Sequence, residues 1–452
     1  MQCPHCNAQL EDGTVFCGNC GKQIAPFQAQ GPTVTYKAGQ GEDNFATVIS
    51  TRQGPQTPIP QTPASNNAYR SNTPYQGVDS PTTLPSTQPP PRKNNTGRII
   101  FIVALVLVII LVGTLGTVAF LNNRTTATTT NNGTTNTPVA TNANGTVSFS
   151  DSQNGTGHSN VVTVNARGLA TPPSGSQYDA WMVNTQSEQA TSLGTLQKNK
   201  DGTYTAKSTS QHNILGLGNR IVVTLEQGTV VVPTGQVVLS ANYPPKAFVH
   251  VKHLLVAFPN TPGKIGLLVG LVDQAQKLSS AAQLLQSISA SQNSSAIQCA
   301  AQSIIDIAEG TNGAHYQPLA NQCASANIAE VGDGYGLLGS GGYIANGEAH
   351  ASLAATQSDT TSTIRVHAGH VTICLQNMNG WISTIDHDAQ DLLNNPNNPA
   401  KVQEIVTLAN HAYNGFDANG DGTIDPIPGE GGALTAYYHG QLMAVLVLAP
   451  GS

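Results

Sequence analysis

The longest apolar run of the chain extends from Ile99 to Leu121 and carries no charged side chain. A helix rises about 1.5 Å per residue, so this run is long enough to cross a hydrocarbon core of about 30 Å. Basic residues lie mainly on its N-terminal side, at Arg92, Lys93 and Arg98. The positive-inside rule therefore predicts one transmembrane helix over 98–121, with the N-terminus in the cytosol and the C-terminal part outside.

Between 145 and 243 the chain consists of short runs in which apolar and polar positions alternate. The runs include VVTVNA, YDAWMV, TYTAKS, RIVVTLE and VVVPTGQVVL, and glycine, proline or asparagine separates them. Alternation with a period of two is typical of strands with one buried face, and breaks every ten residues or so are typical of antiparallel sheets. We expect a small β-sandwich over 145–243.

From about Pro259 the apolar and alanine positions recur three and four residues apart. This period predicts helices, here about five or six of them. Segments with this period include GLLVGLVDQAQKLSSAAQLLQSI, SAIQCAAQSIIDIAEG, TIRVHAGHVTICLQNMNGWISTI and GALTAYYHGQLMAVLVLA. We expect a mainly α-helical bundle over 246–452, whose last apolar stretch, 442–449, is too short to span a membrane.

Two other segments have the composition of unfolded connections. Residues 27–97 are rich in Pro, Gln and Thr and lack an apolar period, which predicts a disordered linker. Residues 122–144 are rich in Thr and Asn and are expected to form a stalk. Only 10% of the residues are charged and the net charge is −6, so nucleic acid is an unexpected partner.

Cysteines near the N-terminus form two C-x-x-C pairs, Cys3 with Cys6 and Cys17 with Cys20. Four thiolates in this spacing form the tetrahedral set that structural zinc prefers, and sulfur then fills every coordination position. A segment as short as 1–26 needs the metal in order to fold. The predicted fold class is therefore a multidomain membrane protein with a small zinc ribbon, one transmembrane helix, a β-sandwich and a mainly α-helical bundle.

Three further cysteines, Cys299, Cys323 and Cys374, lie on the predicted outer side. An oxidising compartment permits a disulfide, and an odd number of cysteines leaves one thiol over. We expect Cys299 to pair with Cys323 and Cys374 to remain a buried thiol.

The segment DANGDGTID resembles the first half of a calcium-binding loop. Its oxygen-bearing residues alternate along the chain, and a glycine occupies the position of the sharp turn. They are Asp417, Asn419, Asp421, Thr423 and Asp425. Pro428 occupies the position of the usual bidentate acid, so Glu430 would have to close the site. We predict a calcium ion that stabilises the loop; the alternative is a turn without metal.

Several histidines fall within the helical patterns. His367 and His370 share one helix face, and His411 or His439 from another helix could complete a transition-metal or haem site. The sequence contains neither the Glu-x-x-His repeat of di-iron bundles nor a C-x-x-C-H haem attachment. The alternative is that these histidines are hydrogen-bonded core residues. Because the common catalytic motifs are also missing from the sequence, we expect no enzyme.

Two parts of the chain resemble known families. The C-P-x-C and C-x-x-C-G pairs resemble a short bacterial zinc-ribbon module found at the N-termini of many membrane proteins. Residues 145–243 resemble the extracytoplasmic domain of anti-sigma-K-type factors, which implies that fold and an outer location. The matching positions are Pro172, Pro173, Gly175, Tyr178, Trp181, Gly194, Gly202, Thr224, Glu226, Pro233, Thr234 and Gly235. Such factors carry a helical sigma-binding domain in the cytosol, where this chain has the cysteine pairs and the linker.

We therefore predict a single-pass bacterial membrane protein with a non-enzymatic role in envelope sensing or scaffolding. The zinc ribbon would bind an unknown cytosolic protein, and the extracytoplasmic part would bind an unknown ligand or protein. The expected ions are structural Zn²⁺ and Ca²⁺. One alternative is a histidine-rich bundle that binds a transition metal or haem. Another is an anti-sigma-like regulator of transcription.

Overall fold

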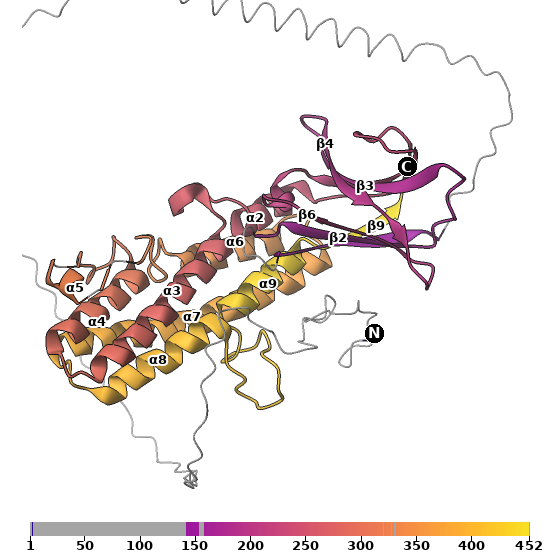
Figure 1. Ribbon diagram of the computed structural model, residues 1–452. Coiled ribbons are helices and arrows are strands. Elements are labelled where there is room, and N and C mark those ends of the chain that lie inside the picture. The colour runs from indigo at the N-terminus through magenta and orange to yellow at the C-terminus, as the bar shows by residue number, and fades with distance from the viewer. Residues whose placement is uncertain are drawn as a thin grey trace, which may run out of the picture. The chain divides into compact units, whose positions relative to one another are not determined.

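The computed structural model describes Gln2 and residues 142–152, 158–319, 321–326, 328–329 and 331–451. Residues 142–451 fall within one compact unit that consists of an antiparallel sheet and a set of long helices (Figure 1). The strands are β1 (Asn144–Ser150), β2 (Val161–Arg167), β3 (Ser176–Asn184), β4 (Gln189–Thr195), β5 (Gln197–Lys198), β6 (Tyr204–Thr209), β7 (Arg220–Gln227), β8 (Gln236–Asn242) and β9 (Leu446–Pro450).

The strands form one nine-stranded sheet in the order β4-β3-β7-β8-β9-β1-β2-β6-β5. Strand β9 comes from the C-terminal end of the chain and lies between β8 and β1, so that it joins the two halves of the sheet. The edge strands β4 and β5 are separated by Leu196 alone, and the sheet is therefore nearly closed. The early part of the chain and its last strand thus belong to the same sheet.

Strand β3 shows why the alternating pattern forms this sheet. Its central residues are buried, and Trp181 is 1% exposed. The indole Nε1 of Trp181 donates a hydrogen bond of 2.9 Å to Oγ1 of Thr224 on the neighbouring strand β7. A buried indole N–H needs such a partner, so the pair satisfies the polar atoms that this strand buries.

The helices are α2 (Pro245–Leu255), α3 (Leu267–Ser289), α4 (Ser294–Glu309), α5 (Asn321–Ser325), α6 (Tyr343–Thr356), α7 (Ser362–Asn394), α8 (Pro399–Asn414) and α9 (Ala433–Met443). Most have one apolar face. In α7, for example, Ile364, Val371, Met378 and Ile385 are buried while Arg365 is exposed. Helix α9 differs because it is buried on almost every side. It packs on α7, α3 and α8 and leads into β9, which connects the helical region directly to the sheet (Figure 1).

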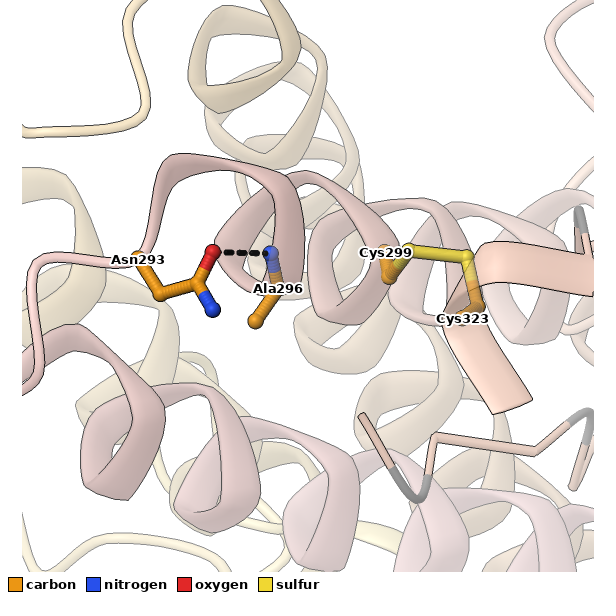
Figure 2. The surroundings of a disulfide bond; sticks show 4 residues. All are labelled: Asn293, Ala296, Cys299 and Cys323. Carbon is orange, nitrogen blue, oxygen red and sulfur yellow. Dashed lines mark hydrogen bonds between the residues drawn. A yellow bond between two sulfur atoms is a disulfide. The ribbon is translucent and has the colours of Figure 1, made fainter. Parts of the chain in front are cut away.

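A disulfide bond fastens the short helix α5 to α4. Cys299 and Cys323 are joined by an S–S bond of 2.04 Å, and the bond closes a loop with a sequence separation of 24 (Figure 2). Asn293 caps the start of α4 by accepting a hydrogen bond from the backbone N–H of Ala296 (Figure 2). Cys374 is a buried free thiol. This is the pairing that we expected from the sequence.

The predicted fold class of a membrane protein with one transmembrane helix is contradicted. Among the described residues, no helix has both the length and the apolar character needed to cross a membrane. The longest described helix, α7, carries Arg365, Asp386, Asp388 and Asp391, because only one of its faces is buried. The run 99–121 itself lies outside the described residues, as do the four N-terminal cysteines.

Two finer expectations also need correction. The predicted β-sandwich is a single, nearly closed sheet, because β9 is hydrogen-bonded to both β8 and β1. The last apolar stretch was expected to be helical throughout. It changes instead from α9 to β9 after Met443, and Leu448 becomes a fully buried residue of the sheet.

Candidate metal centres

Three histidines from two packed helices converge in the helical region. They are His367 and His370 on α7 and His439 on α9, and we call them the inner cluster. The Nδ1 atom of His439 lies 3.0 Å from Nδ1 of His367 and 3.3 Å from Nδ1 of His370. His367 and His439 are fully buried, and His370 is partly exposed. The three ligand atoms lie within 4.8 Å of one another.

The local sequence explains how these rings meet. The spacing of three residues places His367 and His370 on the same face of α7, one turn apart. Helix α9 presents His439 beside Gly440, where the helix approaches its neighbours closely. A Cβ at Gly440 would lie 2.6 Å from the terminal Cδ1 of Leu268, so a larger residue there would require this leucine side chain to move.

The distances fit a metal ion with tetrahedral geometry. Zinc–imidazole bonds are about 2.0–2.1 Å long, which places two ligand nitrogens about 3.3 Å apart in a tetrahedron. The observed separations of 3.0 and 3.3 Å are close to that value. Three such ligands leave a fourth position for water or another group, as in zinc sites with three protein ligands.

Burial favours the neutral form of two members of the inner cluster, His370 and His439. Burial lowers the pKa of His439 well below its ordinary value, and the neighbouring His367 and His370 lower it further. Burial also lowers the pKa of His370, while the carboxylate of Asp425 opposes that change. Neutral imidazoles offer the lone pairs that a metal requires. The inner cluster therefore combines the spacing of metal ligands with burial that favours neutral imidazole at His370 and His439.

Asp425 belongs to the loop that we predicted to bind calcium, and that prediction is not supported. The carboxylate of Asp417 accepts backbone N–H bonds from Gly420 and Gly422, at 2.8 and 2.9 Å. Glu430 accepts a hydrogen bond of 3.0 Å from the N–H of Asp425.

The other predicted calcium ligands are likewise engaged within the loop. Asn419 accepts from the N–H of Asp421, whose own carboxylate accepts from the N–H and hydroxyl of Thr423. Among the described residues, the groups of three or more acidic, histidine or cysteine ligands do not include this loop. Instead, Asn377 of α7 holds the end of the loop by hydrogen bonds to Ile427 and Gly429, and Asp425 is buried near His370.

The structure separates the two histidines that we considered as the third ligand. His439 joins the inner cluster, but His411 on α8 stacks on Phe416 with ring centroids 4.4 Å apart. Its other neighbour is the edge of Trp381, at 5.7 Å between centroids. Haem also fits poorly, because iron between two axial imidazoles would hold their nitrogens about 4 Å apart on opposite faces of a flat ring. Separations of 3.0 and 3.3 Å from Nδ1 of His439 to its two neighbours suit a bare ion instead.

A second cluster of histidines was missed as a site by the sequence analysis. His250 and His253 on α2 converge on His350 of α6, with Nδ1–Nδ1 distances of 3.1 and 3.2 Å. We call these residues the outer cluster, because all three are partly exposed. The signal in the sequence was a second H-x-x-H spacing, identical to that of His367 and His370. His350 lies about a hundred residues further along the chain, so sequence spacing alone could not pair it with His250 and His253.

Two mixed groups of histidine and carboxylate have simpler explanations. Asp388 and Asp391, near His387, form ion pairs with Lys401, which holds α7 against α8. His315 forms an exposed ion pair with Glu309 at 2.7 Å, which raises the pKa of this histidine. Charge pairing accounts for the contacts of Lys401 and of His315 with Glu309 without a metal.

Comparison with known protein families identifies two modules. Residues 2–24 match the family model described as a zinc-ribbon domain. Residues 100–237 match the one described as anti-sigma-K factor rskA, C-terminal. Both predicted resemblances are confirmed. The chain carries a zinc-ribbon domain and an anti-sigma-K-type C-terminal domain.

The second match has a clear structural boundary. It ends within β8, before the helices and before β9, although β9 completes the sheet. Both histidine clusters lie in the part beyond the match. No curated protein and no solved structure shows significant similarity to the chain. The zinc-ribbon match supports structural zinc, and an anti-sigma-factor domain fits a regulatory, non-enzymatic role in envelope sensing.

Proposed function

We propose that the chain is a regulatory protein that senses a late first-row transition-metal ion at the inner cluster. The observation that carries this proposal is the approach of Nδ1 of His367 and His370 to Nδ1 of the buried His439, at 3.0 and 3.3 Å. Imidazole ligands suit zinc and copper, whereas calcium prefers oxygen. Asp425 would help to orient His370 from outside the metal shell, a role that carboxylates commonly play for metal-bound histidines.

The chain connectivity offers a route from this site to the sheet. His439 lies in α9, and β9 begins three residues after that helix ends. A metal ion bound between α7 and α9 would favour the arrangement in which both helices are packed as observed. A ligand shifts an equilibrium between two conformations only if it binds one of them more tightly. This coupling therefore requires that α7 and α9 are less tightly packed when the site holds no metal.

At the other end of the chain, the zinc ribbon would provide the contact with a protein partner. Its four cysteines, Cys3, Cys6, Cys17 and Cys20, have the donor set and spacing of a closed structural zinc site. The anti-sigma-K-type domain makes a sigma factor a reasonable partner to test. Membrane association of the chain stays a prediction.

The disulfide supports an oxidising location for the described unit. Structural disulfides persist in secreted and extracytoplasmic proteins and are rare in the reducing cytosol. Cys299 and Cys323 form such a bond within the same unit as both histidine clusters. This disulfide supports an oxidising environment for the proposed metal sensor.

Metal counting on the purified full-length chain tests the inner cluster. After removal of loosely bound ions and reloading with zinc, His439→Ala should hold one ion fewer per chain than the wild type. His411→Ala is the matched control, because this histidine lies on a neighbouring helix outside the cluster. An equal zinc content in wild type and His439→Ala would refute metal binding at the inner cluster.

Cross-linking tests the regulatory role separately. The full-length chain should capture a cytosolic protein, and a Cys17→Ser/Cys20→Ser variant should lose that capture because its ribbon cannot fold without zinc. Capture that survives this double substitution would show that the ribbon is not the interaction module.

A further inference from the structure

The outer cluster is built on a different pair of helices from the inner cluster. His250 and His253 project from α2, the first helix after the sheet, and His350 projects from α6. The two clusters share one design, an H-x-x-H pair on one helix and a single histidine on a helix packed against it. The two clusters share no residue, although α6 also packs on α7 and α2 on α9.

The spacing of the outer nitrogens again matches a tetrahedral metal site. Nδ1 of His350 lies 3.1 Å from Nδ1 of His250 and 3.2 Å from Nδ1 of His253. Ligand nitrogens around zinc are separated by about 3.3 Å. All three ligand atoms lie within 4.8 Å of one another, so a single ion can contact them together.

Hydrogen bonding alone explains this arrangement poorly. Each imidazole nitrogen carries either one proton or one lone pair. Nδ1 of His350 can therefore form one well-directed hydrogen bond, with either His250 or His253. The other close approach would then share the same proton or lone pair in a poorly directed contact. A cation at the centre makes all three contacts favourable.

The surroundings fix the rings from several sides. Phe258 lies edge-on to His253 and His350, with centroid distances of 5.5 and 5.0 Å. The amide nitrogen Nε2 of Gln357 lies 3.2 Å from Nε2 of His250. If Nδ1 of His250 binds a metal, Nε2 carries the ring proton, and the amide of Gln357 must turn over so that its oxygen accepts this N–H.

The start of α2 is also hydrogen-bonded to Asp359, which lies just after the end of α6. The carboxylate of Asp359 accepts backbone N–H bonds from Lys246 and Ala247, at 2.7 and 3.0 Å. These bonds satisfy the free N–H groups at the beginning of the helix. The two ligands on α2 are thus presented by a helix whose position relative to α6 is already set.

We propose that the outer cluster is a second transition-metal site, in which His250, His253 and His350 bind Zn²⁺ or Cu²⁺ and the fourth position is open to water. The fully buried members of the inner cluster give slow access to an ion, whereas the partly exposed outer site exchanges its ion with solvent. The protein then holds one retained and one exchangeable ion in its helical region.

Exchange kinetics on the full-length chain test this inference. The zinc-loaded protein is mixed with a chromogenic chelator, and ion release is followed over time. The wild type should show a fast phase of one ion per chain that His350→Ala lacks. His212→Ala, at an exposed histidine outside both clusters, and His439→Ala should both keep the fast phase.

Loading the protein with Cu²⁺ tests whether the outer cluster binds copper as well as zinc. An electron paramagnetic resonance spectrum with nitrogen hyperfine coupling that depends on His350 identifies copper binding. Circular dichroism verifies that each variant is folded, and His253→Gln serves as the second variant if His350→Ala does not fold. A folded His350→Ala or His253→Gln that keeps the fast zinc phase and the copper spectrum overturns the proposal. Loss of the fast phase in His439→Ala alone would instead assign the exchangeable ion to the inner cluster.

Discussion

Substitutions in strand β9 test whether this strand joins the helical region and the sheet into one cooperative unit. Leu448 is fully buried and lies opposite Gly145 of β1, while its neighbour Val447 is 68% exposed. Adjacent residues of one strand point to opposite faces, so these two side chains form a natural pair for comparison. We expect Leu448→Ala to destabilise the whole described unit and Val447→Ala to have little effect.

The size of the effect follows from burial. Replacing a buried leucine by alanine costs about 2–5 kcal/mol, because the transfer energy is lost and a cavity remains. Surface substitutions usually change stability by no more than about 0.5 kcal/mol. With about 2.1 cal/mol/K per residue, a unit of roughly 300 residues has an unfolding entropy near 0.6 kcal/mol/K. A loss of about 3 kcal/mol therefore lowers Tm by about 5 °C.

Differential scanning calorimetry of the full-length chain measures this change. Leu448→Ala should lower the main transition by about 5 °C, and Val447→Ala should lower it by less than about 1 °C. If both variants melt alike, β9 does not contribute to the cooperative unit. If only a minor separate transition moves, the sheet and the helices unfold independently, and the proposed route from His439 to the sheet loses its basis.

Three further predictions concern stability. The double variant Cys299→Ser/Cys323→Ser should be less stable by about 3.5 kcal/mol in urea titrations, because the disulfide closes a loop of 24 residues' separation; an unchanged midpoint would contradict this. Burial and the nearby Glu309 raise the pKa of Asp386 to about 6. The carboxyl of Asp386 thus binds its proton more tightly in the native protein than in the unfolded chain, so the free energy of unfolding should fall as the pH rises from about 4 through 6. Urea midpoints measured across that range should not show this fall in Asp386→Asn. Burial tends to raise the pKa of Asp151, but hydrogen bonds from His158, Ser159 and Tyr437 lower it overall. Asp151→Asn should therefore cost about 1 kcal/mol at pH 7 and progressively less as the pH falls through the native pKa, and an equal cost at both ends of the range would count against this role.

Local patterns predicted most elements, but the last strand, β9, depends on contacts with residues distant in sequence. The alternating runs at β2, β3 and β7 and the helical period of α3 and α7 correspond to observed elements. The stretch after Met443 could not be assigned by period, because a short apolar run suits either a helix or a buried strand. Its partners, β8 and β1, lie about two hundred and three hundred residues earlier in the chain.

The grouping of the histidines also depends on contacts between residues distant in sequence. A spacing of three residues identified His367 and His370 as neighbours, because helix geometry fixes that relation. The choice between His411 and His439 depended on which helix packs against α7 at that level, and sequence spacing does not contain this information. The loop DANGDG shows the converse case, in which a matching motif folds into a turn whose carboxylates accept its own backbone N–H groups.

Anomalous diffraction at the zinc absorption edge, from crystals of the zinc-loaded full-length chain, shows whether an ion is bound at the inner cluster. We expect a peak about 2.0–2.1 Å from the Nδ1 atoms of His367, His370 and His439. The zinc ribbon serves as an internal control, because its four thiolates should show a peak in the same data. A peak at the ribbon without one between these three histidines would contradict the account.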